Sequence, residues 1–458
     1  MSSTNLVGSE SPSKASGTLR PQAQRRRTSS VGEIALGDTS SPSLSTMTPT
    51  ENQLRASRNR QRALSGSIGH GSSDLSDGGH QSSSLQTLSE SKSNVQRSGK
   101  QNGQAAESST ASLWWTRYRE LAYQKTWLNP FVFTVFISLV YLVSPKGSLV
   151  YSVLKPFLTL SYPAFDASSG KVMYGKGLKD FCFVAFYTVV FTFIREFCMQ
   201  QILEPLARYS GLRKKGKIDR FMEQTYAIIY YGVMAPWGLW IMYHMPLWYF
   251  ETKPMFENYP HKSHELQFKA YYLLQASFWV QQSVVLMLQL EKPRKDFKEL
   301  VFHHVVTIAL IFCSYKFHFT WMGLPVYITM DLSDLMLSIS KTMNYLNHWL
   351  TGPFFLVFMG VWIYLRHYLN LRILYAVATE FATVGPFDLD FSTQQYKCWI
   401  SQYITFTLIF ALQAVNVYWL VLIIRVAYRF VFLDVQEDVR SEDEDEDAEV
   451  EGEDKKTI

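Results

Sequence analysis

The stretch that decides the fold is residues 299–346, which read ELVFHHVVTIALIFCSYKFHFTWMGLPVYITMDLSDLMLSISKTMNYL. Its two apolar runs, joined by a short turn, predict two antiparallel membrane helices. His303 and His304 interrupt the first run, and Asp331 and Asp334 interrupt the second. Ionisable groups inside a membrane helix normally face the bundle interior, one another or a water-filled cavity, because exposing them to lipid is costly. We therefore take this hairpin as the candidate functional site.

The composition divides the chain into parts of opposite character. Residues 1–112 are rich in Ser, Gly, Gln and Arg and lack an apolar stretch, so we expect a disordered tail and no cleavable signal peptide. Residues 113–433 contain all 12 tryptophans, and residues 433–458 form an acidic tail. The formal net charge of +5 therefore averages a basic arm and an acidic end. We expect a bilayer as the surrounding medium and no nucleic-acid partner.

The predicted fold class is all-α: a polytopic membrane helix bundle of about eight transmembrane helices with disordered cytosolic tails. We expect the first transmembrane helix and an interfacial segment within 113–178, and the main membrane domain within 179–432. A hydrocarbon core of about 30 Å needs about 17–25 helical residues. Eight apolar runs approach that length, near 129–144, 179–198, 222–243, 266–288, 300–317, 324–342, 352–374 and 403–430.

The distribution of Lys and Arg predicts the orientation of the bundle. The connecting segments 201–221 and 289–299 are basic, and they alternate with the cation-poor segments 244–265, 318–323 and 375–399. Because short cytosolic loops carry an excess of Lys and Arg, this alternation predicts that both termini are cytosolic. The segment 145–178, with four lysines, does not follow the pattern.

The two tails contain short motifs of regulation and targeting. Ser29 and Ser65 follow arginines at a spacing that basic-directed kinases prefer, and Ser441 precedes an acidic run that suits an acid-directed kinase. Phosphorylation there competes with the simpler interpretation that such tails contain chance matches. Lys455 and Lys456 stand fourth and third from the end, which is the spacing of a dilysine retrieval signal of the endoplasmic reticulum.

The histidines and aspartates of the hairpin have the chemistry of a proton-transfer or nucleophilic site. A carboxylate that accepts a hydrogen bond from one imidazole nitrogen fixes the tautomer and raises the basicity of the other nitrogen. That nitrogen can take a proton from an attacking amine or attack a thioester itself. We expect His304 to act chemically and Asp334 to orient it, with Thr307 one turn further along the same helix.

Three other interpretations of these polar residues stay open. A histidine in a membrane helix can simply bond a neighbouring helix, and a pair of aspartates can relay protons in a transporter. A membrane metal oxygenase would need several histidine-rich boxes, whereas only 303–304 is a cluster here. The four cysteines have no CxxC spacing, so we expect neither a zinc site nor a disulfide framework, and no metal or other cofactor.

Further positions carry weaker hypotheses for substrate binding. Arg366 lies within the seventh apolar run, where we expect it to pair with a carboxylate of the sixth run or with a substrate phosphate. Basic loop residues flank the predicted cytosolic mouth and would attract a polyanionic cosubstrate such as a nucleotide-bearing thioester. They are Arg213, Lys214, Lys215, Lys292, Arg294 and Lys295.

The hairpin also resembles a known family. Four runs, Phe302–Thr307, Phe317–Gly323, Tyr327–Asp334 and Ser340–Leu346, are similar to the Lag motif of ceramide synthases, and the fungal type is the nearest match. These are the longevity-assurance members of the TLC-domain superfamily. The resemblance covers roughly 129–432, and the chain lacks the homeobox-like insert of many animal members.

The resemblance implies N-acylation of a sphingoid base by a fatty acyl-CoA in the endoplasmic reticulum membrane. It implies that His303, His304, Asp331 and Asp334 are essential, and Asn344 lies within the same motif. It also implies a small single-span accessory subunit, as fungal members use; dimerisation stays open. The competing functions are a non-enzymatic TLC-type protein that handles lipids or assists a translocon, and a transporter.

Overall fold

The computed structural model describes residues 110–167, 170–288 and 296–433. All of them belong to one compact unit, Asn102–Ile458. Several sequence-based predictions lie outside the described residues: the N-terminal and acidic tails, the phosphorylation sites Ser29, Ser65 and Ser441, the dilysine pair Lys455 and Lys456, and the loop residues Lys292, Arg294 and Lys295.

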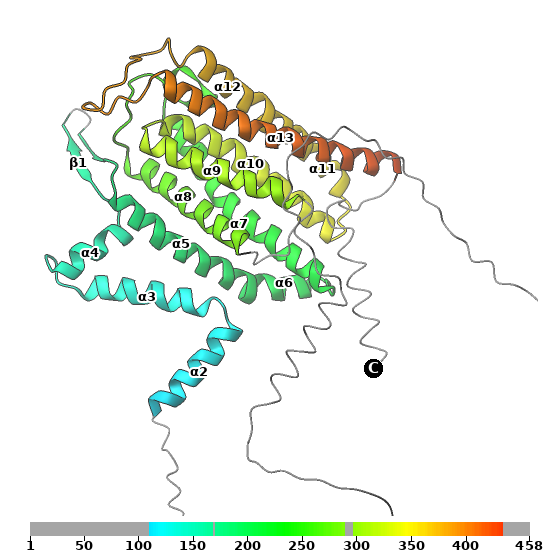
Figure 1. The fold of residues 1–458 in the computed structure, drawn as a ribbon. Helices are drawn as coiled ribbons and strands as arrows, with labels where there is room; N and C mark the ends of the chain where they lie inside the picture. The colour runs from blue at the N-terminus through cyan, green and yellow to red at the C-terminus, as the bar shows by residue number, and fades with distance from the viewer. Residues whose placement is uncertain (1–109, 168–169, 289–295, 434–458) are drawn as a thin grey trace, which may run out of the picture. The chain divides into compact units, whose positions relative to one another are not determined.

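The described chain is mostly helical, and each of the eight expected runs is a helix (Figure 1). The long helices begin and end within a few residues of the expected bounds. The helices are α2 (Thr110–Gln124), α3 (Leu128–Val143), α4 (Leu149–Leu158), α5 (Lys179–Phe197), η1 (Cys198–Leu203), α6 (Glu204–Tyr209), α7 (Lys215–Tyr243), η2 (Trp248–Phe250), η3 (Lys253–Met255), α8 (Leu266–Met287), α9 (Phe297–Lys316), α10 (Thr320–Tyr345), α11 (Thr351–Trp362), η4 (Ile363–Leu369), α12 (Asn370–Thr379) and α13 (Trp399–Leu433).

Four of the helical segments are long and apolar enough to cross a membrane: Lys179–Tyr209, Phe297–Lys316, Thr351–Thr379 and Trp399–Phe430. A fifth arises if α2 and α3, which meet at an angle of 117°, count as one broken span. Helices α7, α8 and α10 are long enough but less apolar. The fold is therefore a polytopic helix bundle, and the count of eight spans stays a prediction.

Two of the long helices contain a π-helical turn. The helix that starts at Lys179 passes through η1, and the helix that starts at Thr351 passes through η4. A π-helical turn inserts an extra residue into the helix, redirects the side chains around it, and frequently occurs at functional sites. Arg366 and His367 lie within η4, and both side chains are buried.

A small β-hairpin accompanies the helix bundle. Strands β1 (Pro163–Asp166) and β2 (Lys171–Tyr174) pair antiparallel, with Pro163 opposite Tyr174. The residue Gly170 has a φ of +67°, a conformation that glycine adopts without steric penalty. Strand β2 is joined in turn to the loop before α8, because the backbone amide of Tyr174 donates to the carbonyl of His264 at 2.8 Å.

The core that surrounds the site lies where α7, α8, α9, α10 and α13 pack together (Figure 1). Aromatic side chains fill it, among them Tyr230, Tyr271, Tyr272 and Phe278. Two glycines allow the close approach of α7 and α10 to α8. A Cβ on Gly238 would lie 2.6 Å from the hydroxyl of Tyr271, and a Cβ on Gly323 would meet the hydroxyl of Tyr272.

Candidate active site

A polar cavity, called here the polar chamber, lies among the helices that carry the histidines and aspartates. Its volume is about 230 Å³. Both histidines of α9, His303 and His304, line it together with Asp334 of α10 and Arg366 of η4. The remaining lining includes Arg195, Glu223, Gln282, Asp296, Trp362 and Trp419. The tertiary structure thus brings together both histidines and Asp334, whereas Asp331 is not part of this lining.

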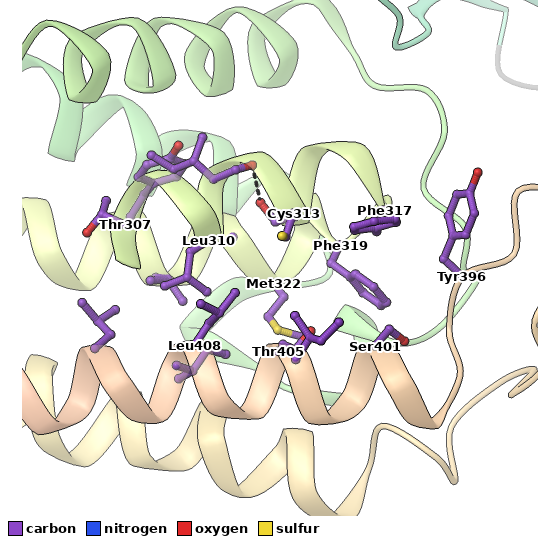
Figure 2. Close-up of a pocket in the computed structure, with 18 of the residues that line it drawn as sticks. Thr307, Leu310, Cys313, Phe317, Phe319, Met322, Tyr396, Ser401, Thr405 and Leu408 are labelled. Carbon is purple, nitrogen blue, oxygen red and sulfur yellow. Dashed lines mark hydrogen bonds between the residues drawn. The ribbon is translucent and has the colours of Figure 1, made fainter. Parts of the chain in front are cut away.

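An apolar cavity, called here the acyl-sized cavity for its volume and apolar lining, lies between α9, α10 and α13 (Figure 2). Its volume is about 270 Å³. Figure 2 shows Thr307 and Leu310 of α9 across from Thr405 and Leu408 of α13. Phe317, Phe319, Tyr396 and Leu389 line it toward the loops that precede α10 and α13, and Cys313 and Cys398 also face it.

Two residues line both cavities: His303 and Trp279. The ring centroids of these two side chains are 5.7 Å apart, and the ring centroid of Trp419 lies 5.1 Å from that of His303. The Nδ1 atom of His303 is buried and has no hydrogen-bond partner among the residues that the structure describes. The imidazole of His303 therefore stands at the boundary between a polar and an apolar compartment.

His304 lies in the polar chamber with one ring nitrogen already engaged. Its Nδ1 lies 2.9 Å from the carbonyl oxygen of Leu300. A carbonyl can only accept a hydrogen bond, so Nδ1 carries the proton, and the lone pair of a neutral ring is on Nε2. Both histidines share an aromatic neighbour, because the Trp279 ring also meets the His304 ring edge to face, with the ring centroids 5.7 Å apart.

Asp334 is held by an arginine. The Nη2 atom of Arg366 lies 2.5 Å from Asp334 Oδ1, which confirms the expectation that Arg366 pairs with a carboxylate of the sixth run. The guanidinium also donates to Ser333 Oγ at 2.6 Å and to Asn416 Oδ1 at 3.1 Å, and it stacks on the Trp362 ring. A buried ion pair is stable when such additional hydrogen bonds satisfy it.

Asp331 occupies a different place from Asp334, although both lie on α10. It is fully buried, and it belongs to neither lining set among the described residues. Gln275 of α8 donates to Asp331 Oδ2, and the hydroxyl of Tyr271 lies 3.5 Å from the same oxygen. The i, i+3 spacing of Asp331 and Asp334 on one helix predicts that both face the histidines across the hairpin. For Asp331 this prediction is wrong, because its carboxylate turns toward α8 and bonds there.

The weaker candidates are only partly brought together. Thr307 lines the acyl-sized cavity one turn beyond His303. Asn344, near the end of α10, is absent from both described linings. Arg213 and Lys214 lie on the exposed segment before α7, and the exposed Lys215 is the first residue of this helix.

Sequence reasoning missed the contributions of α8 and α13. Gln275 and Trp279 lie on one face of α8 at i and i+4, and Asn416 and Trp419 lie on α13 at i and i+3. A polar side chain in a membrane helix often marks a hydrogen bond to a neighbouring helix, and this signal could have identified Gln275 and Asn416.

Among the residues that the structure describes, no group of three or more His, Cys, Asp or Glu side chains has an arrangement that could hold a metal ion.

The chain is similar to proteins of one class of membrane protein, the TLC-domain proteins. Residues 220–425, which contain α8, α9, α10 and most of α13, match the model of the TLC domain. Ceramide synthase LAG1 of Saccharomyces cerevisiae is 46% identical over 420 residues, 91% of this chain and 92% of that protein. Sphingosine N-acyltransferase lac1 of Schizosaccharomyces pombe is 48% identical over 321 residues, 70% of this chain and 82% of that protein.

A bovine protein, ceramide synthase 4 of Bos taurus, is 33% identical over 227 residues, 49% of this chain and 54% of that protein. The yeast relatives match over most of their own length as well as over most of this chain. The chain belongs to the ceramide synthase family, the sphingosine N-acyltransferases of the TLC-domain proteins. The resemblance of residues 299–346 to the Lag motif is thereby confirmed.

Proposed function

We propose that the chain transfers a fatty acyl group from acyl-CoA to the amine of a sphingoid base, so that a ceramide is formed. The observation that carries this proposal for the site is that His303 lines both the acyl-sized cavity and the polar chamber. An acyl chain needs an apolar compartment, while an amine with hydroxyl neighbours needs a polar one. The reacting carbonyl must lie where the two compartments meet, and an imidazole stands there.

The chemistry needs a proton acceptor at that boundary. The amine nitrogen forms a bond to the thioester carbonyl carbon, and the electron pair of the C=O π bond moves onto oxygen. When the C=O bond re-forms, the C–S bond breaks, and its electron pair leaves with the CoA sulfur. A histidine nitrogen takes the proton that the amine loses and returns it to the thiolate. In the competing route the imidazole attacks first, and the amine then attacks the acyl-imidazole.

The lining of the two cavities supports His303 as the histidine nearest the reaction, rather than His304 as the sequence suggested. His303 alone of the two lines the acyl-sized cavity, and the ring of His304 is held by the Leu300 carbonyl. A measurement of free CoA released in an initial burst distinguishes the two routes. Release of one CoA per enzyme before any sphingoid base is added supports the acyl-imidazole, and its absence supports direct attack.

We also propose that the protein lies in the endoplasmic reticulum membrane with both termini in the cytosol. Lys and Arg in 201–221 support this orientation by the positive-inside tendency, and so do those of the loop before α9. In that orientation the polar chamber opens toward the cytosol, where acyl-CoA is dissolved, and Arg213, Lys214 and Lys215 would attract its phosphates. A small single-span accessory subunit is part of the same proposal.

The first test uses membranes that contain this protein with its candidate subunit. Acyl-CoA of several chain lengths and a long-chain sphingoid base are added, and the amide is detected by mass. We expect CoA-dependent amide from the wild type and none from His303→Ala at equal protein level. A folded wild type that makes no amide at any chain length, yet moves lipid across vesicles, would replace the proposal by a transporter or a lipid-handling TLC protein.

A second test asks whether the acyl chain occupies the acyl-sized cavity. Cys313 and Cys398 line it, whereas Cys182 on α5 is outside the described lining. In variants that retain one cysteine each, an alkyl methanethiosulfonate should label Cys313 and Cys398 more slowly when acyl-CoA is present. Labelling of the matched Cys182 variant should not change. Equal labelling of all three with and without acyl-CoA would place the chain elsewhere.

A further inference from the structure

Four buried polar atoms on the lining of the acyl-sized cavity have no partner among the described residues: Trp279 Nε1, Thr307 Oγ1, His303 Nδ1 and Tyr327 Oη. Trp279 packs against the His303 ring, and Thr307 lies one turn from His303 on α9. Trp279 is only 6% exposed. Buried polar groups in folded proteins are nearly always hydrogen-bonded, because burial without a partner is unfavourable. Several unpaired polar atoms close together therefore indicate that a bound ligand supplies their hydrogen-bond partners.

Thr307 differs from the hydroxyls of α5 and α8 and, unlike the similarly unpaired Thr225 and Thr342, it lines a cavity. A threonine or serine inside a helix commonly donates to the carbonyl four residues earlier. The hydroxyls of α5 and α8 do so at 2.7 to 2.9 Å, from Thr188 to Val184, Thr192 to Thr188, Ser277 to Leu273 and Ser283 to Trp279. For Thr307 the corresponding acceptor is the carbonyl of His303, and the hydroxyl makes no bond to it or to any other described residue.

Trp279 differs in the same way from the second indole beside His303. Trp419 Nε1 donates to Asp296 Oδ2 at 3.2 Å, whereas Trp279 Nε1 has no acceptor in the described chain. Both rings lie within 5.7 Å of the His303 ring. The free N–H is therefore a property of Trp279 and is not shared by every indole at this histidine.

A third indole with an unpaired N–H, Trp362, does not compete for this place. The guanidinium carbon of Arg366 lies 4.2 Å from the centroid of its ring. Trp362 lines only the polar chamber and not the acyl-sized cavity. Trp279, in contrast, lines both cavities, as His303 does. Thr307 lies one turn from His303 on the side of the acyl-sized cavity.

We propose that Trp279 and Thr307 are catalytic residues whose N–H and O–H donate to the thioester carbonyl oxygen of the acyl substrate. This inference rests on the proposed acyl transfer. When the nucleophile bonds to the carbonyl carbon, the π electron pair passes to this oxygen and the charge becomes largest there. When the pair returns and the C–S bond breaks, the charge leaves with sulfur. Donors fixed at that oxygen stabilise the state between the two events.

The surroundings make such donors effective. The acyl-sized cavity is lined mainly by apolar side chains, so little competing water reaches a carbonyl held there, and a hydrogen bond to an oxyanion is stronger than in water. Because both donors are already buried and unpaired in the free protein, they lose no other partner when the substrate arrives. Their contribution is greater in the transition state than in the ground state, because the negative charge on the carbonyl oxygen is larger there.

The test compares Trp279→Phe, which keeps an aromatic ring but removes the N–H, and Thr307→Val, which keeps the shape but removes the O–H. We expect kcat to fall about 10²-fold in each, at the lower end of the effect of losing one oxyanion donor. KM for acyl-CoA should stay within about twofold, since the lost interaction belongs to the transition state. Thr307→Ser, which restores a hydroxyl, should recover most of kcat.

Matched controls are Trp240→Phe on the exposed end of α7 and Thr192→Val on α5, which should behave as the wild type. Thermal unfolding in detergent identifies a variant that fails to fold. If Trp279→Phe does not fold, the kcat values of Thr307→Val and Thr307→Ser test the inference. A kcat close to that of the wild type, or a loss confined to KM, overturns this inference while the proposed function stands. No amide from the wild type overturns the proposed function itself.

Discussion

Arg366 Nη2 and Asp334 Oδ1 are 2.5 Å apart, and this contact joins the π-helical turn of η4 to α10. The same guanidinium reaches Asn416 of α13 through Nη1. Three of the helices that surround the histidines are therefore held together by one buried cation. Asp334 lines the polar chamber, and Arg366 of η4 both neutralises its negative charge and sets its orientation.

This ion pair leads to a prediction about stability. Arg366→Met should lower the free energy of unfolding by up to about 3–5 kcal/mol, because it leaves the carboxylate of Asp334, whose side chain is 20% exposed, without its cation. The double variant Arg366→Met with Asp334→Asn should regain most of that loss, since the remaining amide is neutral. Thermal unfolding in detergent measures both. Amide synthesis should be lost in both, so recovery of stability without activity separates the two roles. A double variant as unstable as the single one would contradict this account.

The two histidines should differ in effect. His303→Asn and His304→Asn should each lower kcat by about 10²–10⁴-fold, the range for loss of a general acid or base. If the acyl-imidazole route operates at His303, only His304→Asn retains a burst of CoA before the sphingoid base is added. Rapid quench of acyl-CoA with enzyme alone measures the burst. A burst that survives in His303→Asn would move the nucleophile away from this residue.

Gly238 tests the buried network around Asp331. A Cβ at this position would lie 2.6 Å from the Tyr271 hydroxyl and 2.9 Å from Ile328 Cγ1. Gly238→Ala should therefore destabilise the protein by about 1–3 kcal/mol, as overpacking of a core does. Combining it with Tyr271→Phe removes the hydroxyl and should restore part of the loss. The control is Gly232→Ala on the same helix, where a Cβ has no neighbour within 4 Å. Equal losses for Gly238→Ala and Gly232→Ala would refute the steric argument.

The acyl-sized cavity should limit the length of the acyl chain. Leu408 of α13 lines it, and Leu408→Trp would fill part of the 270 Å³. We expect the ratio of long-chain to shorter-chain product to fall, with total activity on the shorter acyl-CoA retained. Mass analysis of products from a mixture of acyl-CoAs gives the ratio in one reaction. Leu356→Trp, at an exposed position of α11, is the control. An unchanged ratio would show that the chain lies outside this cavity.

Two histidines in the loops outside the helices predict how stability depends on pH. Burial, and next the nearby Lys176, lowers the pKa of His261 to about 4; the same two causes lower the pKa of His318 to about 3. Lys397 acts in the same direction on His261, and Lys262 and Lys316 do so on His318. In the unfolded chain both pKa values lie near 6.5, so between about pH 6.5 and pH 4 the unfolded state binds more protons.

Stability should therefore be fully present above about pH 6.5 and should decline as the pH falls toward 4. The melting temperature measured in one detergent from pH 7.5 to pH 4.5 checks the slope. His318→Gln removes one titrating group and should make the dependence shallower. A variant with the same slope as the wild type would show that His318 does not contribute.

Much of the architecture follows from the order of residues alone. Apolar runs of sufficient length predict helices because a backbone in lipid must satisfy its hydrogen bonds within the segment. For the same reason His303, His304, Asp331 and Asp334 stand out, since each is too costly to leave facing lipid. The density of matching residues across 299–346 was also sufficient to indicate the family.

The tertiary structure decided what these residues contact. Sequence spacing places Asp331 and Asp334 on one face of a helix, yet one carboxylate bonds Gln275 of α8 and the other bonds Arg366. Helix periodicity fixes the angle between side chains but not the helices that pack beside them. The extra residue of the π-helical turn at η4 redirects Arg366, and no hydropathy pattern announces it. Likewise, only the three-dimensional positions of the neighbouring acceptors show that Trp279 Nε1 and Thr307 Oγ1 are unpaired.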